Sequence, residues 1–425
     1  MRILVLGGNG FIGIEIARRL VAVGHETLCV GRNIDSARAR LPGARWIATD
    51  IASLSRPQHW TALLEGVDAI VNAAGALQDG SRDDLEALAS ALLALYEAAE
   101  PASIRIVQIS ARTDGIARDT AFLATKRAMD KQLAKSGLPH CIIRPALVIG
   151  RNAHGGTALI RALASMTLMV PVLHGQSLVA ITGMEELAAL ACEAAEGELA
   201  LGRDVAIAAP DPEPLADIIM QHRAWLGLPP ARALEVPPVI ARVGAWMGDI
   251  AGHFGWRSPM RTTAISVLAG GVTMDRQRPL MESPTLAKTL ARYSPGVQDL
   301  WFGRLYLLKP VLIVALAGFW IASGLLALIS FDSSSALLRS AGFSSATADL
   351  VTIITSVLDC LVGAAVLWRS LARPALLAMI ATSLAYLAFA SLLAPQFWLD
   401  PLGPLVKVIP AIFVAMVALA IIEER

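Results

Sequence analysis

Short apolar runs alternate with helical patterns from Met1 to about Gly150. The runs that we predict to be strands are residues 2–6, 26–30, 45–48, 69–72, 104–109 and 141–143. Strands that alternate with helices are typical of a parallel sheet, in which right-handed crossover connections place the helices on both faces. The first part of the chain is therefore predicted to be an α/β domain.

The pattern becomes less regular beyond residues 1–155, which we take as the core of this domain. Residues 156–300 are rich in proline and glycine, and we expect them to complete the fold and to cover a substrate. The run 158–173 is apolar but contains Arg161 and Pro171. These two residues favour a buried or interfacial helix over a membrane span.

Hydrophobicity rises sharply after Lys309 and Pro310. Residues 311–331 contain no charged side chain, and a helix of that length, at about 1.5 Å per residue, crosses a bilayer core of about 30 Å. Three similar segments follow at residues 350–368, 374–393 and 402–422. Residues 301–425 are therefore predicted to form an all-α transmembrane bundle of four helices.

Basic residues near the predicted spans are distributed unevenly. Those on one side are Arg304, Lys309, Arg369, Arg373 and Arg425, whereas Arg339 and Lys407 fall towards the other side. The positive-inside rule then places both termini and the N-terminal domain in the cytoplasm, as in a multi-pass protein of the cell (inner) membrane. The apolar run after Arg2 is too short for the h-region of a signal peptide, which agrees with this topology.

Asp359 lies near the middle of the second predicted span. A carboxylate at that depth is unfavourable unless it is protonated or hydrogen-bonded, so it indicates either a functional site or a contact between helices. The hydroxyl side chains that we expect to solvate it are Ser323, Thr355, Ser356 and Ser383.

The composition agrees with a chain that is part soluble and part membrane protein. Of 425 residues, 55% are hydrophobic and 17% are charged, and the mean hydropathy is +0.58. A net charge of +1 without a basic stripe argues against nucleic-acid binding. Because the four cysteines lie far apart without CxxC spacing, we expect buried thiols rather than disulfides or a zinc site.

A glycine-rich turn joins the first predicted strand to the first predicted helix. Glycines at this point let the chain turn tightly and let the backbone approach a pyrophosphate, which the N–H groups and dipole of the helix N-terminus then stabilise. The residues that we predict to bind a dinucleotide here are Gly7, Gly8, Asn9, Gly10, Phe11, Ile12 and Gly13.

The ends of the next strands indicate which dinucleotide is bound. No acidic residue follows the second strand, but Arg32 does, and a guanidinium can pair with a 2′-phosphate, so NADP is favoured over NAD. A solvated arginine is the alternative. Asp50, followed by Ile51, is placed to accept from the adenine amine, although a helix N-cap would look the same. After the fourth strand, Ala73, Ala74 and Gly75 permit close approach to the ribose.

Residues 1–300 resemble an atypical, extended-type member of the short-chain dehydrogenase/reductase superfamily, similar to NAD-dependent epimerases and dehydratases, which have a Rossmann-type sheet. The matching residues are Gly7 to Gly13, Asn72 to Gly75, Ser110, Lys126 and Arg144 to Gly150. From about residue 305 the chain resembles the DoxX-like four-helix membrane domain, through Leu307-Leu308-Lys309-Pro310 and Trp398 to Pro404.

The resemblance implies a catalytic Tyr-x-x-x-Lys pair preceded by a serine. In this chain Phe122 stands at the tyrosine position, and a phenyl ring can neither donate nor accept a proton. Ser110 and Lys126 remain, with Lys126 implied as a ligand of the nicotinamide ribose and Pro145 as part of the nicotinamide end. Other candidate acids are Ser110, Arg112, Thr113, Asp114 and His154.

Two functions are compatible with these features. The first is a membrane-anchored NADP(H)-dependent oxidoreductase or epimerase-like enzyme, with the bilayer as partner and a lipophilic or membrane-delivered substrate. The second is a non-catalytic NADP(H)-binding module for redox sensing, assembly or structure, with a membrane protein as partner. Phe122 favours the second function, and the fusion to four spans favours the first.

Overall fold

The computed structural model describes residues 1–75, 84–111, 121–256, 258, 260–262, 271, 280–401 and 403–423, without the side chains of Ala121, Phe122 and Leu280. The chain divides into two compact units. One contains Met1–Ile250 with Ser258–Gly303, and the other contains Ala251–Arg257 with Arg304–Arg425.

The first unit is built on a parallel sheet, as predicted. Its strands are β1 (Arg2–Leu6), β2 (Glu26–Gly31), β3 (Arg45–Ala48), β4 (Ala69–Asn72), β5 (Arg105–Ile109), β6 (His140–Pro145), β11 (Arg203–Ala208) and β14 (Leu280–Glu282). Their order is β14-β11-β6-β5-β4-β1-β2-β3, and every neighbouring pair is parallel. All six predicted strands are confirmed, whereas β11 and β14 were not predicted.

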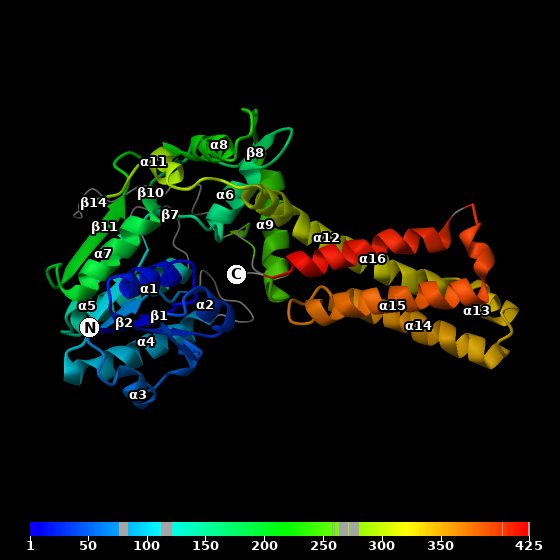
Figure 1. The fold of residues 1–425 in the computed structure, drawn as a ribbon, viewed down its shortest axis with the longest axis horizontal. Helices are drawn as coiled ribbons and strands as arrows, with labels where there is room; N and C mark the ends of the chain where they lie inside the picture. The colour runs from blue at the N-terminus through cyan, green and yellow to red at the C-terminus, as the bar shows by residue number, and fades with distance from the viewer. Residues whose placement is uncertain are drawn as a thin grey trace. The chain divides into compact units, whose positions relative to one another are not determined.

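Helices cover both faces of this sheet (Figure 1). The helices on one face are α1 (Gly13–Ala22), α2 (Asp35–Arg40) and α7 (Met184–Glu196), and those on the other are α3 (Thr61–Leu64), α4 (Leu85–Ala99) and α5 (Ala121–Lys135). Successive strand residues point to opposite faces, so Ile3 and Val5 join one core while Leu4 and Leu6 join the other. This burial on both sides explains why the strands are continuously apolar.

A third core lies in the carboxyl half of the first unit. It contains residues from α6 (Gly156–Ala164), α8 (Leu215–Trp225) and α11 (Leu286–Ala291). Short strands complete this region: β7 (Leu147–Ile149), β8 (Val170–Val172), β9 (Leu178–Val179), β10 (Ile181–Gly183), β12 (Glu213–Pro214) and β13 (Ala233–Glu235). Arg161 is buried in α6, where it pairs with Asp299 at 3.1 Å. The prediction of a buried or interfacial helix at residues 158–173 is thus confirmed as a buried helix up to Ala164, whereas residues 170–172 form strand β8.

The second unit is helical. Its helices are α12 (Val297–Ile329), which begins in the first unit, α13 (Phe331–Ser340), α14 (Ser345–Ala365), α15 (Ala372–Leu393) and α16 (Pro404–Ile421). Among the described residues, four of these, all except α13, are long and apolar enough to cross a membrane, so the predicted set of four long apolar helices is confirmed. The first span was predicted to begin at residue 311, but α12 already begins at Val297 and continues through Pro310.

Asp359 of α14 receives hydrogen bonds from two other helices. Ser323 Oγ of α12 donates to Oδ2 at 3.1 Å, and the Tyr386 hydroxyl of α15 donates to Oδ1 at 2.9 Å. Of the four expected hydroxyls, Ser323 is therefore confirmed, whereas Thr355 donates to Val351 O of its own helix. Tyr386 was not predicted. These bonds join three helices of the bundle, as expected for a polar contact between spans.

Candidate functional site

The order of the sheet strands reverses around β1, which lies between β2 and β4. In open parallel sheets, ligands bind outside the carboxyl ends of the strands at such a reversal. The glycine-rich turn joins the carboxyl end of β1 to α1 and therefore lies at this point.

The glycines of the turn are packed so closely that larger side chains do not fit. Gly7 has φ of +70°, and a Cβ on it would lie 2.9 Å from Ala74 Cα. A Cβ on Gly8 would lie 2.7 Å from Cys29 Cβ, and one on Gly13 would lie 2.2 Å from Gly7 O. Among the described residues no side chain caps α1. The turn is thus suited to bringing backbone and helix N-terminus against a pyrophosphate.

Two predicted cofactor ligands, Arg32 and Asp50, lie beyond the neighbouring strands β2 and β3. Asn9 Nδ2 donates to Asn33 O at 3.0 Å, so it holds the loop in which Arg32 is exposed. Asp50 Oδ1 accepts from Ala52 N at 3.2 Å and caps the short helix Ile51–Ser53. The capping role of Asp50 is therefore observed, while its contact with adenine stays a prediction.

His154 lies beside the glycine-rich turn. Its ring stacks on Phe11 with 5.9 Å between ring centroids. The residue itself is exposed, and its backbone is tied to Thr157, whose hydroxyl donates to His154 O at 3.0 Å. The structure therefore places this candidate at the cofactor turn, through the same Phe11 that the sequence indicated.

The loop after β4 is fixed by a buried amide. Asn72 Oδ1 accepts from Ala74 N at 3.1 Å, and Asn72 Nδ2 donates to Gln108 Oε1 at 2.8 Å. This positions Ala73 and Ala74 against Gly7. The two loops predicted to touch the cofactor are thus brought together at one edge of the sheet.

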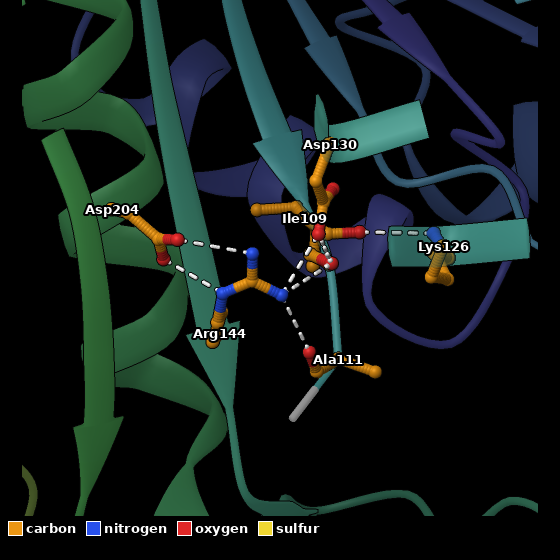
Figure 2. Close-up of polar contacts among 7 residues, drawn as sticks. Ile109, Ala111, Lys126, Asp130, Arg144 and Asp204 are labelled. Atoms are coloured by element: carbon orange, nitrogen blue, oxygen red, sulfur yellow. Dashed lines mark hydrogen bonds and ion pairs between the residues drawn. The ribbon is translucent and has the colours of Figure 1, made fainter. Parts of the chain in front are cut away.

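Lys126 reaches this edge from α5. Its Nζ donates to Ala74 O at 3.2 Å and to Ile109 O at 3.1 Å, the latter drawn in Figure 2. A Cβ on Gly75 would lie 3.4 Å from this nitrogen. Burial lowers the pKa of Lys126 to about 8, although nearby Asp130 opposes the shift. An ammonium has three N–H groups, so after these two bonds to described residues one donor remains for a ligand.

Ser110 belongs to a buried polar network with Asp130 and Arg144, which are labelled in Figure 2. Its hydroxyl donates to Asp130 Oδ2 at 2.6 Å, and Arg144 pairs with the same oxygen at 2.8 Å. Arg144 also donates to both oxygens of Asp204, at 2.7 and 3.0 Å. Burial raises the pKa of Asp130, which Arg144, Ser110 and Lys126 each counteract. The network holds Ser110 at the end of β5.

Asp130 was not predicted from the sequence to have a role. It lies four residues after Lys126 on α5, so both side chains lie on the same face of the helix. That four-residue spacing is the feature of the sequence that could have predicted that Asp130 lies near Lys126.

The sequence indicated Arg144 only as part of the segment Arg144 to Gly150, and the structure places it at the centre of the network. Pro145, which follows it, is buried at the carboxyl end of β6.

Some predicted positions lie outside the described residues. They are Arg112, Thr113 and Asp114, together with the side chain of Phe122. Their roles as candidate acids, or as the replaced tyrosine, stay predictions.

Comparison with known families agrees with both halves of this arrangement. Residues 7–166 match a family described as NAD(P)H-binding, and residues 317–416 match the DoxX-like family. The chain joins an NAD(P)-binding Rossmann domain to a DoxX-like domain. This confirms the family resemblances that the glycine-rich turn and the motifs around the spans indicated.

Individual relatives match over parts of their length. The chain is 44% identical over 78 residues to dTDP-6-deoxy-L-talose 4-dehydrogenase (NAD(P)(+)) of Kitasatospora kifunensis, covering 18% of this chain and 23% of the relative. It is 27% identical over 148 residues to photosystem II assembly factor Ycf39 of Synechocystis sp., covering 34% and 44%. The chain thus spans less than half the length of these relatives.

A solved structure supports the fold. The nucleoside-diphosphate-sugar epimerase of Staphylococcus aureus superposes with a TM-score of 0.51 at 13% identity, covering 71% of this chain and 100% of the epimerase. At this identity the likeness concerns the fold.

A second cluster of polar side chains lies at the opposite edge of the sheet. His25, Cys192 and Glu196 have their potential ligand atoms within 4.8 Å of one another. His25 Nε2 and Glu196 Oε1 are 2.7 Å apart, which is a hydrogen-bond distance. Burial, reinforced by Glu196, raises the pKa of Cys192 to about 11, so the thiol stays protonated. We interpret the cluster as a hydrogen-bonded pair beside a buried thiol.

Proposed function

We propose that this chain is a membrane-anchored NADP(H)-dependent oxidoreductase or epimerase-like enzyme. The observation that carries the proposal is the position of Lys126, whose ammonium lies beside Gly75 at the cofactor edge with its pKa lowered to about 8. A lysine with a pKa near physiological pH is suited to donate and accept a proton. Lys126 thereby offers the proton transfer that Phe122 does not.

Each residue of the site has a separate role in binding, positioning or proton transfer. The turn from Gly7 to Gly13 binds the pyrophosphate, and Lys126 holds the nicotinamide ribose. The bound nicotinamide supplies the hydride chemistry. Lys126 has one N–H beyond its bonds to Ala74 O and Ile109 O; the ribose hydroxyl and the oxygen of a carbonyl substrate share it, and Lys126 protonates the carbonyl oxygen. Ser110 donates its one hydroxyl proton to Asp130, so it ties the end of β5 to the helix that carries Lys126.

The DoxX-like domain suggests where the substrate comes from. A nucleotide domain joined to four apolar helices is best explained by a substrate that is lipophilic or delivered from the bilayer. Following the positive-inside rule, we place the nucleotide domain and the C-terminus in the cytoplasm, with the chain in the cell membrane.

Cofactor preference tests the role assigned to Arg32. Full-length protein in detergent is expected to bind NADPH more tightly than NADH, and Arg32→Ala is expected to weaken NADPH binding about tenfold to hundredfold, as for loss of a charged hydrogen bond. NADH affinity should stay unchanged. Calorimetric titration measures both, and Arg38→Ala, an exposed arginine of α2, is the matched control. Equal affinities of the wild type for the two cofactors would contradict the assignment.

The second candidate is a non-catalytic NADP(H)-binding module. Two observations favour it: Phe122 stands where the resemblance expects tyrosine, and one relative is named as an assembly factor. In this case the cofactor would stabilise the domain or report redox state, and the membrane helices would recruit a protein partner.

Restoring the phenol separates the two candidates. The Phe122→Tyr variant and the wild type are screened with NADPH against carbonyl substrates in detergent micelles, with NADPH consumption as the readout. Because Lys126 is proposed to donate the proton, the wild type is expected to turn over and the variant to gain at most modestly. Turnover by the variant alone would favour the non-catalytic module.

A further inference from the structure

An apolar stripe is exposed on α9 (Pro238–His253). Its residues, with their exposed fractions, are Val239 (68%), Ile240 (62%), Val243 (54%), Trp246 (62%), Met247 (58%) and Ile250 (37%). Six large apolar side chains exposed on one helix are unusual for a surface that faces only water.

The six residues occupy one side of the helix. At about 100° per residue they fall within an arc of about 120°. The other side is packed: Ala241 and Ala245 are 7% and 0% exposed, and a Cβ on Gly248 would lie 1.9 Å from Met260 O. Arg242 is exposed at the rim of the apolar arc. The helix is therefore amphipathic, and its apolar side is the one that the described part of the chain leaves exposed.

The residues that follow α9 belong to the helical unit and contact the connection between two spans. Phe254 packs edge-on against Trp368 with 4.8 Å between ring centroids. Phe254 O accepts from Arg369 N at 2.9 Å, and Trp256 Nε1 donates to Leu367 O at 2.6 Å. Since α14 ends at Ala365 and α15 begins at Ala372, the chain leaving α9 is fixed at the ends of these two helices.

Two cations lie near Trp256, where the chain after α9 contacts the connection between two spans. Lys309 Nζ lies 5.9 Å and Arg369 Cζ 5.6 Å from the ring centroid of Trp256. Tryptophan together with lysine and arginine at the end of a span is the composition of the bilayer interface, where the rings lie at headgroup level and the cations meet phosphates. The carboxyl end of α9 is thus joined, by three residues, to a part of the chain with interfacial character.

We propose that α9 lies in the bilayer interface, with its apolar stripe in the acyl boundary and Arg242 reaching the headgroups. A helix with one apolar side, a charged rim and a Trp in the apolar arc is suited to this position. The occupant of the stripe is lipid, because the helix continues directly into the interfacial attachment. The proposal is independent of whether the nucleotide domain is an enzyme or a module.

Spin-label accessibility tests the proposal on the full chain in lipid nanodiscs. Labels are attached to Val243→Cys and, separately, Met247→Cys, in a Cys360→Ala background because the other cysteines are buried. Lipid contact is expected to give collisions with oxygen several-fold more frequent than with a water-soluble nickel chelate. Leu93→Cys, an exposed position of α4, is the control and should show the reverse.

Each alternative occupant has its own signature. Easy access by the nickel chelate at both α9 positions would mean that the stripe faces water and would overturn the proposal. Protection from both oxygen and nickel would mean that protein covers the stripe, and spin–spin broadening would identify a second copy of the chain. Either result would also overturn it. NADPH binding by each labelled variant verifies that the protein is folded.

Discussion

Replacing Lys126 with methionine is expected to reduce turnover about 100-fold to 10,000-fold, the range for loss of a general acid. NADPH binding should also weaken about tenfold to hundredfold, because one charged hydrogen bond to the ribose is lost. Methionine fills a similar volume without an ammonium that burial disfavours, so the variant is expected to fold. Single-turnover NADPH oxidation measures the first effect and calorimetric titration the second.

The control for this variant is Lys131→Met, which removes an exposed lysine from the same helix. It should leave both quantities unchanged. The pH profile provides a further check, because burial lowers the pKa of Lys126 to about 8. The protonated form is lost as pH rises through that value, so carbonyl reduction should slow above it. A rate independent of pH between 7 and 9 would contradict the role of Lys126 as proton donor, even if binding were affected.

The sheet and the cofactor turn were predictable because their signals are local. A strand buried on both faces is a continuous apolar run, as in Ile3 to Leu6, and the tight contact of Gly7 with Ala74 is possible only without a Cβ. The four spans were predictable because the bilayer requires length and apolarity together. Each of these constraints acts within one segment of the chain. The sequence of that segment is therefore enough to predict the element, without knowledge of the segments that pack against it.

The polar networks were harder to predict because they join distant segments. Asp130 was not predicted because its partners are distant in the sequence: Ser110 lies 20 residues earlier, and Arg144 lies on β6. Likewise, Tyr386 was not assigned to Asp359, since nothing in the sequence indicates which of the helices lie face to face. The acid was recognisable from its depth in the span, but its hydrogen-bond donors follow from helix packing.

Arg144→Met is expected to destabilise the first unit by about 3–5 kcal/mol, because it leaves the buried carboxylate of Asp130 without its cation. Only 6% of the Arg144 side chain and 4% of the Asp130 side chain are exposed, so water cannot replace the lost partner, whereas Asp204, at 33%, can be hydrated. Amide hydrogen exchange of β5 and β6 measures the free energy of opening locally, without interference from the membrane helices.

Two comparisons distinguish loss of charge balance from loss of packing. Arg203→Met, an exposed change on β11, should have little effect, and adding Asp130→Asn to Arg144→Met should recover part of the loss because no unpaired charge remains.

The pH dependence of the stability difference between Arg144→Met and the wild type has a defined sign. Burial raises the pKa of Asp130, and Arg144 opposes that shift, so without Arg144 the pKa rises further. Protonation then relieves the buried charge, and the difference from wild type should shrink as pH falls. A deficit that is constant with pH and unaffected by Asp130→Asn would instead indicate that Arg144 acts through packing.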